Sequence, residues 1–139
     1  MSPEARQMVK ESWALAAPAA EELARGFYAR LFEIDPDAAR LFAATDMDVQ
    51  RDKFVAMLVA IVAAVDEPRV LVADAAALGR RHAGYGAAPP HYASVGEALL
   101  LALATALGPA LTPEVRAAWA EAYTLVAAVM RRAAGATTR

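Results

Sequence analysis

One histidine of the chain stands where its side chain could bind a metal ion. His82 ends a helical stripe that also contains Leu71, Ala75 and Leu78, at spacings i, i+4, i+7 and i+11. That spacing places an ionisable imidazole on the face of a helix that should be dry. Because histidine is the commonest metal ligand in proteins, His82 is a candidate ligand. The alternative is a core histidine whose ring nitrogens are satisfied by hydrogen bonds.

Two further polar residues lie on apolar stripes of other predicted helices. Tyr28 follows Phe27 on one stripe, and Gln50 lies one turn before Phe54 on another. Burying such a group without a partner costs roughly 1–3 kcal/mol. Each group can instead find a backbone partner, or reach solvent if its helix is slightly rotated. A polar ligand shared with His82 would satisfy all three groups at once, which favours a buried binding site.

The composition excludes several other classes of site and partner. The chain has 139 residues and no cysteine, which excludes disulfides, iron–sulfur clusters and thiolate zinc sites. Its net charge of −2 at pH 7 provides no field that would attract nucleic acid or anionic lipid. The first residues do not resemble a signal peptide, and the most apolar runs, 57–65 and 98–104, are shorter than the ~20 residues of a membrane span. We therefore expect a cytoplasmic protein that binds neither nucleic acid nor membrane.

Prolines and acidic residues divide the chain into helices. Ser2, Asp35 and Thr112 each precede a proline, which is the pattern of an N-cap followed by the first helical residue. Apolar residues recur with helical spacing, and no segment alternates as a strand does. The predicted helices cover residues 3–16, 18–34, 36–42, 49–65, 68–83, 92–107 and 113–134. The sequence thus predicts one all-α domain, residues 1–139, of about seven helices.

The predicted helix boundaries depend on glycine and proline. Gly84 and Gly86 are expected to end the helix that carries His82, and Pro89-Pro90 to keep the chain extended before Tyr92 begins the next helix. The core is expected to span about residues 3–134, and residues 135–139 to form a frayed tail.

Motifs along the chain resemble, in order, those of the globins. They are closest to bacterial single-domain globins related to the haem domain of flavohaemoglobins. Residues 27–32 match the segment that carries the distal tyrosine, residues 50–54 the start of the distal helix, and residues 79–82 the proximal histidine segment. Further matches are residues 10–13, 41–42, 91–100 and 118–123. The resemblance runs from about Lys10 to Ala134 and implies the globin fold, in which helices pack around a haem pocket.

The resemblance implies a role for each candidate residue. His82 corresponds to the proximal ligand, which gives a ring nitrogen to the iron of a non-covalent haem b, iron protoporphyrin IX. Tyr28 and Gln50 correspond to the distal pair, whose hydrogen bonds stabilise bound dioxygen. The residues expected around the haem itself are Phe42, Phe54, Leu58, Tyr92, Val95, Leu99 and Tyr123.

Basic residues near these segments have two interpretations. Lys53 and Arg81 are candidates for contacting the haem propionates, and the alternative is an exposed position on a solvated helix face. His91 is the other histidine of the chain. Since it follows two prolines and starts a helix, we expect it at the surface or at the haem edge, and not on the iron.

The chain departs from the flavohaemoglobin pattern at two positions. Those proteins carry a glutamate on the last helix that pairs, through a tyrosine, with the proximal histidine. The tyrosine position is kept as Tyr92, but the glutamate position falls at about Ala134. Without that acid the histidine should be a weaker electron donor, so weak peroxidase chemistry is expected. The second departure is Phe54, where the family usually has leucine; its ring is expected to narrow the pocket or to move Gln50 outward.

Three functions are compatible with this pattern. The resemblance implies reversible binding of dioxygen, nitric oxide and carbon monoxide at a histidine-ligated haem, and so oxygen transport or buffering. An alternative is a nitric oxide dioxygenase or nitrite reductase. That enzyme would need an external reductase, because 139 residues leave no room for flavin and nicotinamide domains. A third interpretation is a haem-free globin that acts through protein contacts, which would be favoured if His82 lacked the companions Tyr28 and Gln50.

Overall fold

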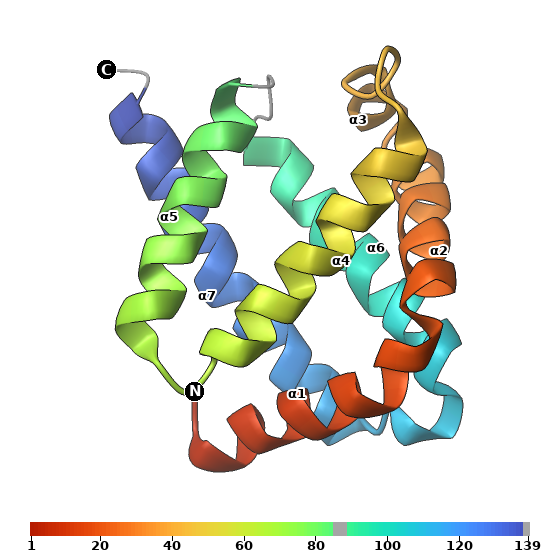
Figure 1. Ribbon diagram of the computed structural model, residues 1–139, viewed down its shortest axis with the longest axis vertical. Coiled ribbons are helices and arrows are strands. Elements are labelled where there is room, and N and C mark those ends of the chain that lie inside the picture. The colour runs from red at the N-terminus through yellow and green to blue at the C-terminus, as the bar shows by residue number, and fades with distance from the viewer. Residues whose placement is uncertain (85–88, 138–139) are drawn as a thin grey trace.

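The computed structural model describes residues 1–84 and 89–137 and is helical throughout, with no strand over these residues (Figure 1). The helices are α1 (Pro3–Ala16), α2 (Ala20–Ile34), α3 (Pro36–Arg40), α4 (Met47–Ala64), α5 (Pro68–Gly84), α6 (Pro89–Leu107) and α7 (Pro113–Thr137). Two short 3-10 segments are η1 (Ala17–Ala19) and η2 (Gly108–Ala110). Six long helices and the short α3 confirm the prediction of an all-α fold with about seven helices.

Side chains just before the helices satisfy the N–H groups of the first helical turns, which have no partner within the helix. Ser2 Oγ accepts from the backbone N–H of Ala5 at 3.0 Å. Asp35 Oδ1 accepts from the N–H of Ala38 at 3.1 Å. The same role is played at α4 by Asp46 and at α7 by Thr112. The sequence pattern predicts the caps at Ser2, Asp35 and Thr112, and the structure adds Asp46 as the cap of the helix that starts at Met47.

Some helix boundaries differ from the prediction. Residues 89–90 were expected to be extended, and this is wrong, because α6 begins at Pro89. Proline suits the first turn of a helix, where its missing N–H would have no partner. Helix α7 continues to Thr137, two residues beyond the position at which the tail was expected to begin. The predicted stop at Gly84 agrees with the end of α5, whereas Gly86 lies outside the described residues.

The arrangement of the helices brings the candidate residues toward one end of the molecule. Helix α1 lies across the opposite end, and α5 runs alongside α7 (Figure 1). Helices α4 and α5 meet at the short connection between Ala64 and Pro68 and then diverge. Gln50 lies near the diverging end of α4, and His82 lies in the last turns of α5. The fold therefore places Gln50 on α4 and His82 on α5, at the end of the molecule where these two helices are apart.

Helix α6 provides much of the core. Its residues Ala98, Leu99, Ala102 and Leu103 are buried, and Leu103 is fully enclosed. Judged by length and composition alone, the helical stretch of residues 91–110 could cross a membrane. The shorter apolar run 98–104 that the sequence indicated lies within it. A third of that stretch is buried in the fold, where α6 packs mainly against α2.

A buried hydrogen bond joins the first helix to the last. Trp119 Nε1 donates to Ser12 Oγ at 2.8 Å, and the Ser12 hydroxyl donates to the carbonyl oxygen of Met8 at 2.6 Å. Both Ser12 and Trp119 are buried. Because an unpaired indole N–H would be costly in this core, the bond fixes how α1 lies against α7.

Helices α5 and α7 approach each other closely at Gly79. A Cβ atom at this position would lie 2.3 Å from the carbonyl oxygen of Met130 and 2.5 Å from its Cα atom. The neighbour is backbone, which cannot rotate away as a side chain can. Gly79 therefore sets the distance between α5 and α7, one turn before His82.

We expect Gly79→Ala to destabilise the fold. Overpacking a tight contact costs about 1–3 kcal/mol, and here the clash is with backbone. Gly26→Ala is the matched control, because a Cβ atom at Gly26 of α2 would meet nothing within 4 Å. That helical substitution should stabilise by about 0.5–1 kcal/mol. The midpoints of urea unfolding would measure both changes, and equal effects of the two substitutions would contradict the close contact.

Candidate functional site

The ring of His82 is oriented by its own helix. Its Nδ1 atom lies 2.9 Å from the carbonyl oxygen of Leu78, one turn earlier in α5. A carbonyl oxygen can only accept, so Nδ1 carries the hydrogen and donates it. In the neutral ring this leaves the lone pair on Nε2, the nitrogen that can act as a metal ligand.

The surroundings of His82 favour the neutral ring. Burial lowers the pKa of the imidazole below its ordinary value, and the nearby Arg81 cation lowers it further. The bond to the Leu78 carbonyl opposes this shift but does not reverse it. His82 is therefore a neutral, oriented imidazole of the kind that metal ions require.

Tyr28 and Gln50 form a hydrogen bond across the α2–α4 interface. Gln50 Nε2 donates to the Tyr28 hydroxyl oxygen at 3.0 Å. Only 6% of Tyr28 is exposed, and burial raises the pKa of its phenol above the ordinary value. The hydroxyl therefore keeps its hydrogen at neutral pH. The two side chains satisfy each other in part, so their burial does not by itself require a bound ligand.

Aromatic rings surround the Tyr28 side chain. The ring centroids of Phe42 and Phe54 lie 5.5 and 5.7 Å from that of Tyr28, each in an edge-on arrangement. Phe54 also stacks on Phe27, with centroids 4.2 Å apart and planes inclined by 14°. Phe54 has thus turned into the α2–α4 core. Gln50 keeps its hydrogen bond to Tyr28 beside this ring, and the expectation that Phe54 narrows the pocket or moves Gln50 outward stays a prediction.

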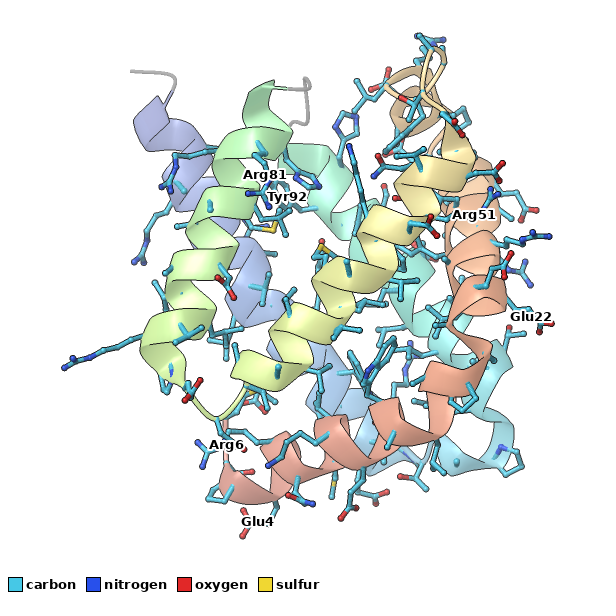
Figure 2. The ribbon with its side chains drawn as sticks, in the orientation of Figure 1. Glu4, Arg6, Glu22, Arg51, Arg81 and Tyr92 are labelled. Carbon is cyan, nitrogen blue, oxygen red and sulfur yellow. The ribbon has the colours of Figure 1, made fainter. Side chains whose placement is uncertain are left out.

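The remaining predicted haem contacts fall into buried and exposed groups. Leu58, Leu99 and Tyr92 are buried, whereas Val95 and Tyr123 are partly buried and pack against the core. Lys53 and Arg81 are exposed. Figure 2 shows Arg81 at the end of the molecule where α5 ends and α6 begins. Exposure suits either interpretation of the two basic residues, a propionate contact or a solvated helix face.

Two side chains of α7 lie beside Tyr92: Tyr123, which the sequence indicated, and Arg131, which it did not. Tyr123, from α7, donates its hydroxyl hydrogen to the carbonyl oxygen of Tyr92. The guanidinium carbon of Arg131 lies 5.7 Å from the Tyr92 ring centroid, in a cation–π arrangement. Burial raises the pKa of Tyr92, and Arg131 partly offsets this. The α7 group seen beside Tyr92 is thus a cation, where flavohaemoglobins are expected to supply a carboxylate.

His91 was expected at the surface or at the haem edge, and the structure excludes the surface. Only 9% of the residue is exposed, and its Nε2 atom lies 3.0 Å from Asp37 Oδ2. The partner is 54 positions earlier in the chain, so no local pattern could have indicated the pair. His91 starts a helix, as predicted, but its ring is directed at the segment that follows α2.

Known proteins share the sequence pattern of this chain. Residues 25–130 match the model of the globin family. The chain belongs to the globin family. It is 33% identical to a flavohemoprotein of Rhodopirellula baltica over 129 residues, which cover 91% of this chain and 32% of that protein. Flavohemoproteins of Bordetella pertussis and Deinococcus radiodurans are 33% and 31% identical over 88% and 94% of this chain. The chain spans about a third of the length of these relatives.

The residues of this globin suit the haem that the resemblance implies. The decisive feature is the donor set: His82 has its hydrogen on Nδ1 and its lone pair on Nε2, in a partly buried position at the end of α5. On the diverging helix α4 and its neighbour α2, the Gln50–Tyr28 pair supplies polar hydrogens inside an aromatic cluster. One side can bind a metal and the other can bind a small polar ligand.

We expect His82→Ala to prevent stable haem binding. Removing the imidazole removes the predicted iron ligand, and added imidazole should restore much of the spectrum by filling the space that the side chain leaves. Absorption spectra of the purified variant, with and without imidazole, measure this. His91→Ala is the control and should retain haem. Normal haem content in the His82 variant together with loss in the His91 variant would reverse the assignment.

Proposed function

We propose that this globin binds haem b and uses it to bind dioxygen and other diatomic ligands reversibly. The observation that carries the proposal is the part-buried Gln50–Tyr28 hydrogen bond, because Gln50 donates to the phenol oxygen and leaves the phenolic hydrogen for another acceptor. Haem supplies a ferrous iron that binds diatomic gases. The absence of cysteine supports a haem held without thioether bonds.

The distal residues of this chain have distinct tasks in the proposed site. A phenol oxygen carries one hydrogen and can accept two hydrogen bonds. Gln50 occupies an acceptor position of Tyr28, so the hydroxyl hydrogen remains for donation elsewhere. A ligand that carries partial negative charge, such as bound dioxygen, would accept that hydrogen. Tyr28 is then the direct donor, and Gln50 acts mainly by orienting it.

A second candidate function is dioxygenation of nitric oxide to nitrate. The names of the relatives favour it, because the word flavohemoprotein denotes a haem together with a flavin. That reaction consumes one electron for each nitric oxide that is converted to nitrate, so turnover would need an electron donor. The globin match takes up residues 25–130 of the 139, so the electrons would come from a reductase outside these residues.

The proposal is tested first by absorption spectra of the purified protein in its ferric, ferrous and oxygenated forms. A stable oxygenated spectrum supports reversible binding. Rapid conversion of the oxygenated form to the ferric form on adding nitric oxide, followed by cycling with a reductase, supports the dioxygenase. A purified protein that contains no haem, and takes none up when haem is added, would overturn both.

We expect Tyr28→Phe to speed dioxygen release by about tenfold or more. A hydrogen bond to a charged group contributes about 1.5–3 kcal/mol, and 1.4 kcal/mol corresponds to a factor of ten. Gln50→Leu should have a smaller effect, because it leaves the donor in place. Stopped-flow measurement of dioxygen release gives these rates. An unchanged rate in the Tyr28 variant would mean that the hydroxyl points away from the ligand.

The double variant and a second gas provide the controls. If Gln50 acts through Tyr28, removing both should change dioxygen release about as much as removing Tyr28 alone, so the effects do not add. Carbon monoxide bears less charge and gains little from a donor. Its release should therefore change far less, which distinguishes a lost hydrogen bond from a widened pocket.

We also expect low peroxidase activity from the wild-type protein. Ala134 stands near the position of the family glutamate, and Arg131 places a cation at Tyr92. Ala134→Glu, combined with Arg131→Gln, should raise the rate of peroxide-dependent dye oxidation by restoring an acid and removing the opposing charge. Arg132→Gln is the control for loss of a neighbouring exposed cation. A wild-type rate equal to that of glutamate-bearing flavohaemoglobins would contradict this interpretation.

A further inference from the structure

Two segments that are distant in sequence meet beside the start of α6 and bring together three side chains able to bind a metal. Asp35 and Asp37 come from the junction of α2 and α3, and His91 comes from the first turn of α6. One oxygen from each carboxylate and one nitrogen of His91 all lie within 4.8 Å of one another. The chain has only two histidines, and the other is His82.

The separation of His91 from Asp37 already approaches that of two ligands on one metal. His91 Nε2 and Asp37 Oδ2 are 3.0 Å apart. Two ligands that each lie about 2.0–2.2 Å from a tetrahedral zinc ion are roughly 3.3–3.5 Å apart. A metal ion could therefore take the place of the hydrogen between these two atoms with a movement of only a few tenths of an ångström.

Groups outside the cluster hold two of its three members in place. Asp35 Oδ2 accepts from the Ser94 hydroxyl at 2.8 Å, and its Oδ1 accepts from the Ala38 N–H at 3.1 Å. His91 is nine-tenths buried, which restricts its ring. Oriented carboxylates with supporting hydrogen bonds are typical of metal ligands.

The charge and exposure of Asp37 suit an ion that arrives from solvent. Its side chain is 69% exposed, and its other oxygen lies 3.7 Å from the guanidinium of Arg40, itself 82% exposed. An exposed ion pair of this kind contributes little, so Arg40 can move away easily. Two carboxylates balance the charge of a divalent ion, and the exposed side leaves room for water to complete its coordination.

We propose that Asp35, Asp37 and His91 form a binding site for a divalent transition-metal ion such as Zn²⁺, which ties the α2–α3 junction to the start of α6. One imidazole nitrogen and two carboxylate oxygens are ligands that zinc accepts. This site is separate from His82 and does not depend on the proposed haem function. Occupancy would stiffen the segment that leads into Tyr92 and Val95.

Calorimetric titration of the metal-free protein with zinc chloride tests the proposal. We expect one saturable site per chain, reversed by a chelator. His91→Gln and Asp37→Asn should each weaken binding at least tenfold. Asp48→Asn is the matched control, because Asp48 also lies in the first turn of a helix and pairs with an arginine, Arg51, but does not belong to the cluster of Asp35, Asp37 and His91. It should leave the affinity unchanged.

A second variant separates this site from the other histidine. His82→Ala should bind zinc as the wild type does, whether or not the protein carries haem. The thermal unfolding midpoint should rise with zinc in the wild-type, Asp48 and His82 proteins but not in the His91 and Asp37 variants. Far-UV circular dichroism confirms that each variant is folded. Absence of saturable binding, equal weakening by Asp48→Asn, or loss of binding only in His82→Ala would overturn the proposal.

Discussion

The close backbone contact between α5 and α7 is the constraint on which the site depends. Gly79 brings its own helix against the backbone of Met130, where no side chain could fit between them. His82 follows one turn later, so its height and direction are set relative to α7. Helix α7 also fixes the start of α6, through the hydroxyl of Tyr123 and the carbonyl of Tyr92. One long helix thus serves as the reference for both segments on the His82 side of the molecule.

Patterns local in sequence predicted most of the fold, because helices depend on capping and on apolar periodicity. The pattern Ser2-Pro3 and its counterparts at Asp35 and Thr112 marked true helix starts. Errors arose where two local rules compete. A proline both restricts the residue before it and suits the first turn of a helix. At Pro89 the preference of proline for the first helical turn prevails, and α6 begins there.

The candidate site was predictable in its residues but not in its bonds. Helical spacing indicated that Tyr28, Gln50 and His82 face inward, and Tyr28 is indeed buried. Spacing could not show that Gln50 donates to Tyr28 while His82 donates to Leu78. Those bonds depend on how helices cross and on which rotamers fit. The His91–Asp37 contact was beyond reach for the same reason, since it joins two side chains 54 positions apart.

The residues on the distal and proximal sides of the proposed haem site favour reversible ligand binding over peroxidase chemistry. On the proposed distal side, Tyr28 is protonated, buried and already held by Gln50, so a bound ligand would gain a hydrogen bond without the entropy loss of ordering the donor. On the proximal side, His82 donates to a neutral carbonyl, and the group that α7 places at Tyr92 is the cation Arg131. A neutral carbonyl acceptor leaves less electron density on the imidazole than a carboxylate acceptor would. In the proposed haem site this combination would stabilise a bound diatomic ligand more than it would promote cleavage of an oxygen–oxygen bond, which is why we place reversible binding ahead of oxidative chemistry.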